Sequence, residues 1–122
     1  MAAVSPTFNN SVKPGDGSVV LATWSGLNSS NNVGAAVEFP AHADRSVQFE
    51  GTYDSATAVL QGSNDGTNWG TLYDGQGNAL SSTSNAAPKQ IVEITRFIRP
   101  STSGGGGSQA INCTIIMRRP KN

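Results

Sequence analysis

Short runs in which apolar and polar residues alternate recur along the chain, separated by clusters of Gly, Asn, Asp, Ser and Pro. In residues 46–51, Val47 and Phe49 fall on one face of an extended chain, and Gln48 and Glu50 fall on the other. No window keeps the apolar spacing i, i+3, i+4, i+7 that marks an amphipathic helix. The pattern therefore predicts about eight or nine short strands, as in β-sandwiches and barrels.

The predicted strands cover residues 19–24, 33–39, 46–51, 57–63, 69–73, 79–81 and 109–118. Residues 90–94 and 96–99 form either one strand or a strand and a bend, which Pro100 stops. The run Gly104–Gly107 predicts a flexible hairpin tip, because consecutive glycines pack no side chain and cost entropy to order. In the last strand, one face is apolar and consists of Ile111, Cys113, Ile115 and Met117.

The strongest local signal is a β-hairpin in which residues 57–63 and 69–73 flank the turn at residues 64–68. Asp65-Gly66 favours this turn, because Gly accepts the positive φ that hairpin turns require. We expect the hairpin to be exposed around Asp65 and Gly66. Trp69 has two interpretations, packing near the hairpin base or partial exposure directly after the turn.

These elements predict an all-β fold, a single-domain antiparallel β-sandwich with jelly roll as the preferred topology. Residues 1–18 are expected to form an extended N-terminal arm, and residues 19–122 the sandwich. Phe8 and Val12 are sizeable apolar side chains of this arm, and we expect them to anchor it on a partner. Under this hypothesis, deleting residues 2–14 abolishes partner binding and leaves the fold intact.

Composition narrows the classes of partner. The 122 residues have a formal net charge of zero and only 13% charged side chains, which argues against nucleic acid as the main partner. Arg96 and Arg99 lie close together in the sequence. They belong either to a solvated strand edge or to a contact with a partner. A single cysteine, Cys113, excludes an intrachain disulfide. No signal peptide or membrane-spanning apolar run is visible, so we expect synthesis in the cytoplasm and no membrane partner.

Chemistry-bearing residues form no recognisable catalytic or metal-binding motif. The eight acidic residues lie mostly in turns and show no spacing that selects a catalytic pair. His42 and Cys113 are far apart in the sequence, without local features of a nucleophile and its base. We therefore expect no catalytic residues, no metal, no cofactor and no enzymatic activity. The aromatic residues either fill the core or form a sugar-stacking platform: Trp24, Tyr53, Trp69 and Tyr73.

Residues 46–118 resemble small proteins of tailed-phage structural modules. The resemblance depends on V-Q-F-E-G-T at 47–52, Q-G-S-N-D-G-T-N-W at 61–69, L-Y-D-G-Q-G-N-A-L at 72–80 and I-R-P at 98–100, followed by the glycine-rich loop and a last strand. The family it indicates is that of head decoration, or cement, proteins of tailed bacteriophages. The first 45 residues match no known pattern.

The resemblance implies a structural virion protein, made in the host cytoplasm, that binds the capsid exterior and staples neighbouring major capsid protein subunits. It implies the major capsid protein and further copies of this chain, as dimers or trimers, as partners. The family has no catalytic residues to transfer. The motif S-N-D-G-x-x-W also occurs in discoidin-type and other carbohydrate-binding sandwiches, so a glycan-binding module and a tail or baseplate module are alternatives.

Overall fold

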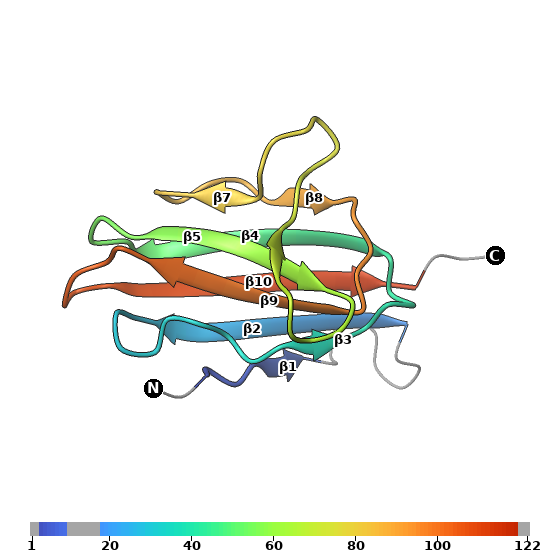
Figure 1. Cartoon of the computed structure of the whole chain (residues 1–122), viewed down its shortest axis with the longest axis horizontal. Helices are drawn as coiled ribbons and strands as arrows, with labels where there is room; N and C mark the ends of the chain where they lie inside the picture. Colours follow the sequence, from blue (N-terminus) through green and yellow to red (C-terminus); the bar gives the residue numbers. More distant parts are fainter. Residues whose placement is uncertain (1–2, 10–17, 120–122) are drawn as a thin grey trace.

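The computed structural model describes residues 3–9 and 18–119, which form two antiparallel β-sheets packed face to face (Figure 1). The first sheet has the strand order β1-β2-β10-β4-β8, with bounds Thr7–Asn9, Val19–Leu27, Ala110–Arg118, Asp44–Thr52 and Lys89–Ile91. The second sheet has the order β3-β9-β5-β6, with bounds Val37–Glu38, Phe97–Ser103, Thr57–Ser63 and Gly70–Thr71. A further short strand, β7 (Ser81–Ser82), pairs with β5. The predicted all-β sandwich is confirmed.

Alternation of side chains produces the long strands where the sequence predicts them. In β10 the alternate residues Ile111, Cys113, Ile115 and Met117 are all buried, as expected from their shared face. The strands predicted over 19–24, 46–51 and 57–63 are confirmed in β2, β4 and β5. Among residues 3–9 and 18–119 there is no helix of the length and apolarity needed to span a bilayer.

The strand pairs enclose one another along the sequence, and successive pairs belong to alternate sheets. β2 pairs with β10 and β4 with β8 in the first sheet, while β3 pairs with β9 and β5 with β6 in the second. From β2 to β5, successive strands alternate between the sheets. This order is compatible with the jelly roll, which stays a prediction.

The segment from residue 89 to residue 103 forms two strands in different sheets, β8 and β9. Pro100 was predicted to stop the second strand. Instead it lies in the middle of that strand, opposite Leu60. The N–H of Leu60 donates to the carbonyl of Leu80, and the carbonyl of Leu60 accepts the N–H of Leu72. The Leu60–Pro100 pair therefore exchanges no ladder hydrogen bond. The missing N–H of proline therefore removes no bond to β5.

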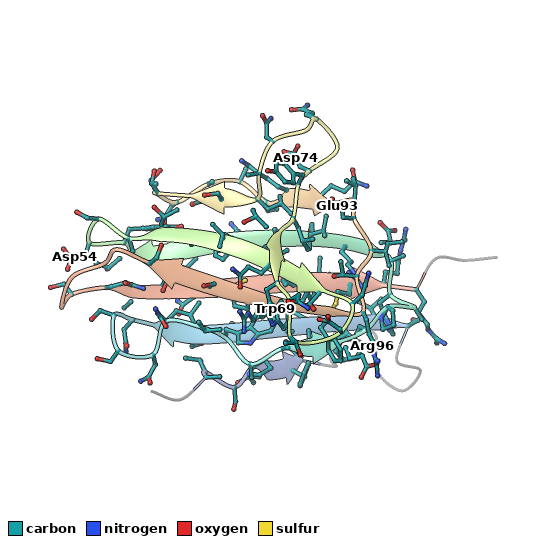
Figure 2. The ribbon with its side chains drawn as sticks, in the orientation of Figure 1. Asp54, Trp69, Asp74, Glu93 and Arg96 are labelled. Atoms are coloured by element: carbon teal, nitrogen blue, oxygen red, sulfur yellow. The ribbon has the colours of Figure 1, made fainter. Side chains whose placement is uncertain are left out.

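The glycine run connects β9 in the second sheet to β10 in the first, and these two strands do not pair, so the prediction of a hairpin tip is wrong. Asp54 binds this loop from the β4–β5 turn (Figure 2). Its carbonyl accepts the Gly106 N–H at 3.1 Å, and its Oδ2 accepts the Ser108 N–H at 2.9 Å. These hydrogen bonds hold the loop in position, although its glycines have no side chains that could pack.

The N-terminal segment is bonded to both sheets. β1 pairs with β2 at the edge of the first sheet. Val4 donates its N–H to the carbonyl of Val33, and its own carbonyl accepts the N–H of Ala35. Val33 in turn forms a β-bridge with Ser101 of β9. Part of the predicted arm is therefore an edge strand, and the strand expected over 33–39 shortens to β3. Val12 lies outside the described residues.

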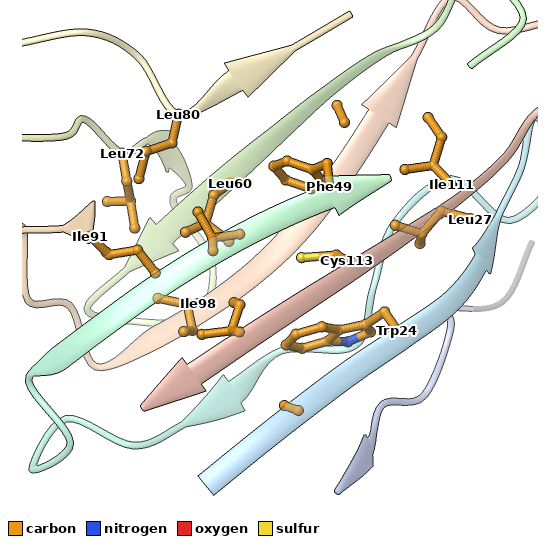
Figure 3. Packing of buried hydrophobic residues seen from close by; sticks show 14 of the residues in the cluster. Trp24, Leu27, Phe49, Leu60, Leu72, Leu80, Ile91, Ile98, Ile111 and Cys113 are labelled. Atoms are coloured by element: carbon orange, nitrogen blue, oxygen red, sulfur yellow. The ribbon is translucent and has the colours of Figure 1, made fainter. Parts of the chain in front are cut away.

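The core fills the space between the sheets, and Figure 3 shows side chains from both sheets meeting there. Trp24, Leu27, Leu60 and Cys113 are completely buried. Complete burial of a large apolar side chain contributes about 1.5–3 kcal/mol to folding. Burial also raises the pKa of the Cys113 thiol, which is the opposite of what an activated nucleophile requires.

Strand length differs sharply between the middle and the edges of the sheets. The interior strands β2, β4 and β10 have 9 residues each, and β5 and β9 have 7 each. At the edges, β1 and β8 have 3 residues each, and β3, β6 and β7 have 2 each. The central strand β10 is paired along nearly its whole length on both sides, whereas β1 covers only Leu21–Thr23 of β2 and β8 covers only Arg45–Val47 of β4.

Candidate interaction surface

The β5–β6 hairpin predicted around Asp65 and Gly66 is confirmed, and its turn is exposed. Oδ1 of Asp65 accepts the N–H groups of Thr67 and Asn68, each at 2.8 Å. These bonds, first that of Asn68 and then that of Thr67, hold the pKa of Asp65 well below its usual range. Gly66 has φ +77°, the positive value expected for the turn. Asp65 is thus a structural residue that orders the turn.

The hairpin turn packs against the start of β9. Oδ1 of Asn64 accepts the backbone N–H of Arg96 at 3.0 Å. A Cβ placed on Gly66 would lie 3.4 Å from the ring of Phe97, so the aromatic ring covers the glycine backbone. The turn and the start of β9 therefore form one continuous surface.

Arg96 joins this surface to β3. Its Nε lies 2.6 Å from Oε2 of Glu38, and its guanidinium lies 4.9 Å from the ring centroid of Phe97. Both partners of the ion pair are about half exposed, at 57% and 47%, so water screens the attraction and the pair contributes little to stability. Its effect is to fix where the guanidinium lies.

Arg99 and Trp69 form a stack on the outer side of the second sheet. The Cζ atom of Arg99 lies 4.0 Å from the centroid of the Trp69 ring. Oε1 of Gln61, on β5, accepts the Arg99 Nε–H at 2.9 Å. Of the two interpretations of Trp69, the structure gives a half-buried ring packed at the hairpin base.

Phe8 extends the surface towards the N-terminal edge. Its side chain is 46% exposed and meets Phe39 edge to face, with 5.9 Å between the ring centroids. Phe39 follows Glu38 directly, so Phe8 and Arg96 contact adjacent residues. Buried Arg45 fixes this part of the chain by donating to the carbonyls of Phe39, at 2.7 Å, and His42, at 2.6 Å.

These contacts define a surface that we call the arginine–aromatic strip. In Figure 2 its members Trp69 and Arg96 lie in the lower half of the view, whereas Asp74 and Glu93 lie in the upper half. The strip contains four of the seven residues singled out in the sequence. Asp65 and Gly66 support it through the hairpin turn, and Val12 lies outside the described residues. The members of the strip are Phe8, Glu38, Phe39, Trp69, Arg96, Phe97 and Arg99.

Three members of the strip, Glu38, Phe39 and Phe97, were not identified from the sequence. Glu38 and Phe39 act through Arg96 and Phe8, which are far away in the sequence, and Phe97 covers Gly66 of the hairpin turn, so no local pattern marks them. Three further exposed apolar side chains were also missed: Tyr73, Val92 and Ile94, with exposed fractions of 45%, 42% and 56%. The backbone N–H of Tyr73 donates to the Glu93 carboxylate at 2.6 Å, which links Tyr73 to the segment that carries Val92 and Ile94.

The aromatic residues do not assemble into the platform considered for sugar stacking. Trp24 is completely buried and donates its Nε1–H to the carbonyl of Ala35 at 2.9 Å. Tyr53 is only 8% exposed, and its hydroxyl lies 3.0 Å from that of Ser82. The guanidinium of Arg99 covers one face of Trp69. Tyr73 alone of the four is well exposed.

Within the part of the chain that the structure describes, no group of three or more His, Cys, Asp or Glu side chains is placed to hold a metal ion. Comparison with protein-family models, curated proteins and solved structures gave no match.

Proposed function

We propose that this protein is a structural virion protein that binds the outer surface of a phage capsid and staples neighbouring major capsid protein subunits, stabilising the head. The sequence resemblance of residues 46–118 supports the class of protein. The arginine–aromatic strip supports binding to another protein, and it is the observation on which the proposal mainly depends.

The composition of the strip is that of a protein interface. Aromatic residues and arginine are enriched at the centres of such interfaces and account for most of the binding free energy measured by substitution. Arg96 and Arg99 are held by Glu38 and Gln61 before any partner arrives. Side chains already fixed in place lose less entropy on binding, which favours affinity.

Under this proposal the protein is located on the virion exterior and contacts the major capsid protein. Self-association as a dimer or trimer belongs to the same proposal, because decoration sites lie at or near symmetry axes of the capsid. Neither nucleic acid nor membrane is proposed as a partner, since the formal net charge is zero.

The carbohydrate-binding alternative has less support. It requires exposed, coplanar aromatic rings, whereas Trp24 and Tyr53 are buried and Trp69 is covered on one face by Arg99. A tail or baseplate location would use the same strip on a different partner.

The decisive experiment adds purified protein to particles assembled without it and images them by electron microscopy. Density on the capsid exterior is the expected result. The double variant Arg96→Ala/Arg99→Ala should lose this density, whereas Ile116→Ala, an exposed residue of the other sheet, should keep it. Density confined to the tail, or no density for the wild-type protein, would overturn the proposal.

A further inference from the structure

Arg99 is fixed in position without being neutralised. Its two partners among the described residues, the Trp69 ring and the Gln61 amide oxygen, carry no charge. Among residues 3–9 and 18–119, the ion pairs join Arg96 to Glu38 and Arg118 to Asp44, and neither involves Arg99. The neighbouring arginine of the strip, Arg96, therefore has a counter-charge that Arg99 lacks in the described part of the chain.

The hydrogen bond that Arg99 makes to Gln61 determines which edge of its guanidinium is left to bind a ligand. Gln61 uses the Nε–H, so the terminal Nη1 and Nη2 groups remain for a ligand. Two parallel N–H groups match the two oxygens of a carboxylate, which is the geometry of bidentate recognition. Stacking on Trp69 fixes the plane of the fork.

The local environment also favours a negative ligand. Partial burial lowers the pKa of Arg99, which shows that its cation has lost part of its hydration. A partly dehydrated cation gains more from a counter-ion than a fully hydrated one does. Geometry and electrostatics thus indicate the same ligand.

We propose that Arg99 is the receptor for a carboxylate of the partner protein, an Asp or Glu side chain bound by Nη1 and Nη2 while Trp69 supports the guanidinium. The identification of that protein as a capsid subunit rests on the function proposed above. An acidic sugar would present the same carboxylate, but a sugar-binding site would use the aromatic face that Arg99 already covers.

The test measures binding of the wild-type protein and three variants to particles assembled without it. Arg99→Lys keeps the charge and loses the fork, and Arg99→Gln loses both. We expect affinity to fall about 10- to 100-fold for each of them, the range for charged hydrogen bonds. Arg118→Lys is the matched control, because Arg118 is paired with Asp44 on the other sheet and lies outside the strip, and it should stay within about twofold of wild type.

Competition identifies the source of the carboxylate. Poly-L-glutamate should displace the wild-type protein from the particles, and sialyllactose should not. Displacement by sialyllactose alone would overturn the assignment to a protein carboxylate. Wild-type binding with unchanged affinity of Arg99→Lys would overturn the bidentate receptor and leave the proposed function standing. Absence of wild-type binding would overturn both.

Discussion

The guanidinium of Arg99 stacks on the indole of Trp69, with 4.0 Å between Cζ and the ring centroid. Arg99 comes from β9, and Trp69 lies just before β6, on the far side of β5 in the same sheet. Gln61 on the intervening strand holds the Arg99 Nε–H, so three neighbouring segments contribute to one group. Trp69 and Arg99 therefore act as a unit, and changing one alters the exposure of the other.

Arg99→Ala should make Trp69 more accessible to water. We expect stronger quenching of tryptophan fluorescence by acrylamide and a loss of stability of about 0.5–1 kcal/mol, the range for an exposed cation–π contact. The same substitution in a Trp69→Phe background should leave quenching unchanged, because Trp24 is completely buried. Equal quenching of wild type and Arg99→Ala would contradict the stack.

Removal of residues 2–9 should destabilise the fold. The deletion removes β1 and both backbone hydrogen bonds of Val4, and each hydrogen bond contributes about 0.5–1.5 kcal/mol net. We expect a lower midpoint in urea denaturation. Phe8→Ala keeps these backbone bonds and should change the midpoint much less, so it is the better probe of partner binding. A truncated chain as stable as the full one would contradict this role of the segment.

Ser55→Gly should stabilise the protein by about 0.5–1 kcal/mol, because Ser55 has φ +71° in the β4–β5 turn. Glycine adopts this conformation without the steric cost that a Cβ imposes. Thermal unfolding followed by circular dichroism measures the change. The control Ser103→Gly, in a strand, should destabilise by a similar amount, since glycine there only adds freedom to the unfolded chain. A lower melting temperature for Ser55→Gly would contradict the prediction.

Asp65 should make stability depend on pH in the acid range. Its pKa is lower in the folded chain than in the unfolded one, so the stabilisation is complete above the unfolded value, about 3.9. It is lost as pH falls from there through the folded value, because the unfolded state binds the proton first. Urea unfolding at several pH values should show Asp65→Asn less stable than wild type near pH 6, with the two curves converging in acid. Parallel curves would show that the carboxylate does not titrate in this way.

Local features were predictable from the sequence because their causes are local. Asp65-Gly66 specifies its own turn through bonds within residues 63–68, and the alternation in β10 specifies its buried face. Pro100 was misread because its tolerance depends on which way Leu60, forty positions earlier, directs its backbone. Gly104–Gly107 was misread because Asp54, far away in the sequence, binds the loop.

The strip was predictable only in part, for the same reason. Arg96, Arg99 and Trp69 were singled out by residue type, but the pairings that orient them cross between strands. Glu38 reaches Arg96 from β3, and Gln61 reaches Arg99 from β5. No spacing along the chain encodes such pairs, since they depend on the strand order and register of the sheet.

The short edge strands bear on how copies of this protein behave when crowded. The edge strands offer a stray chain only two or three residues of backbone to template on, and β10, paired on both sides, offers it no free edge. Fibrous growth by shared sheets is thereby disfavoured, even at a near-neutral charge that offers little mutual repulsion. Contact with another molecule is left to side chains, which can discriminate one surface from another.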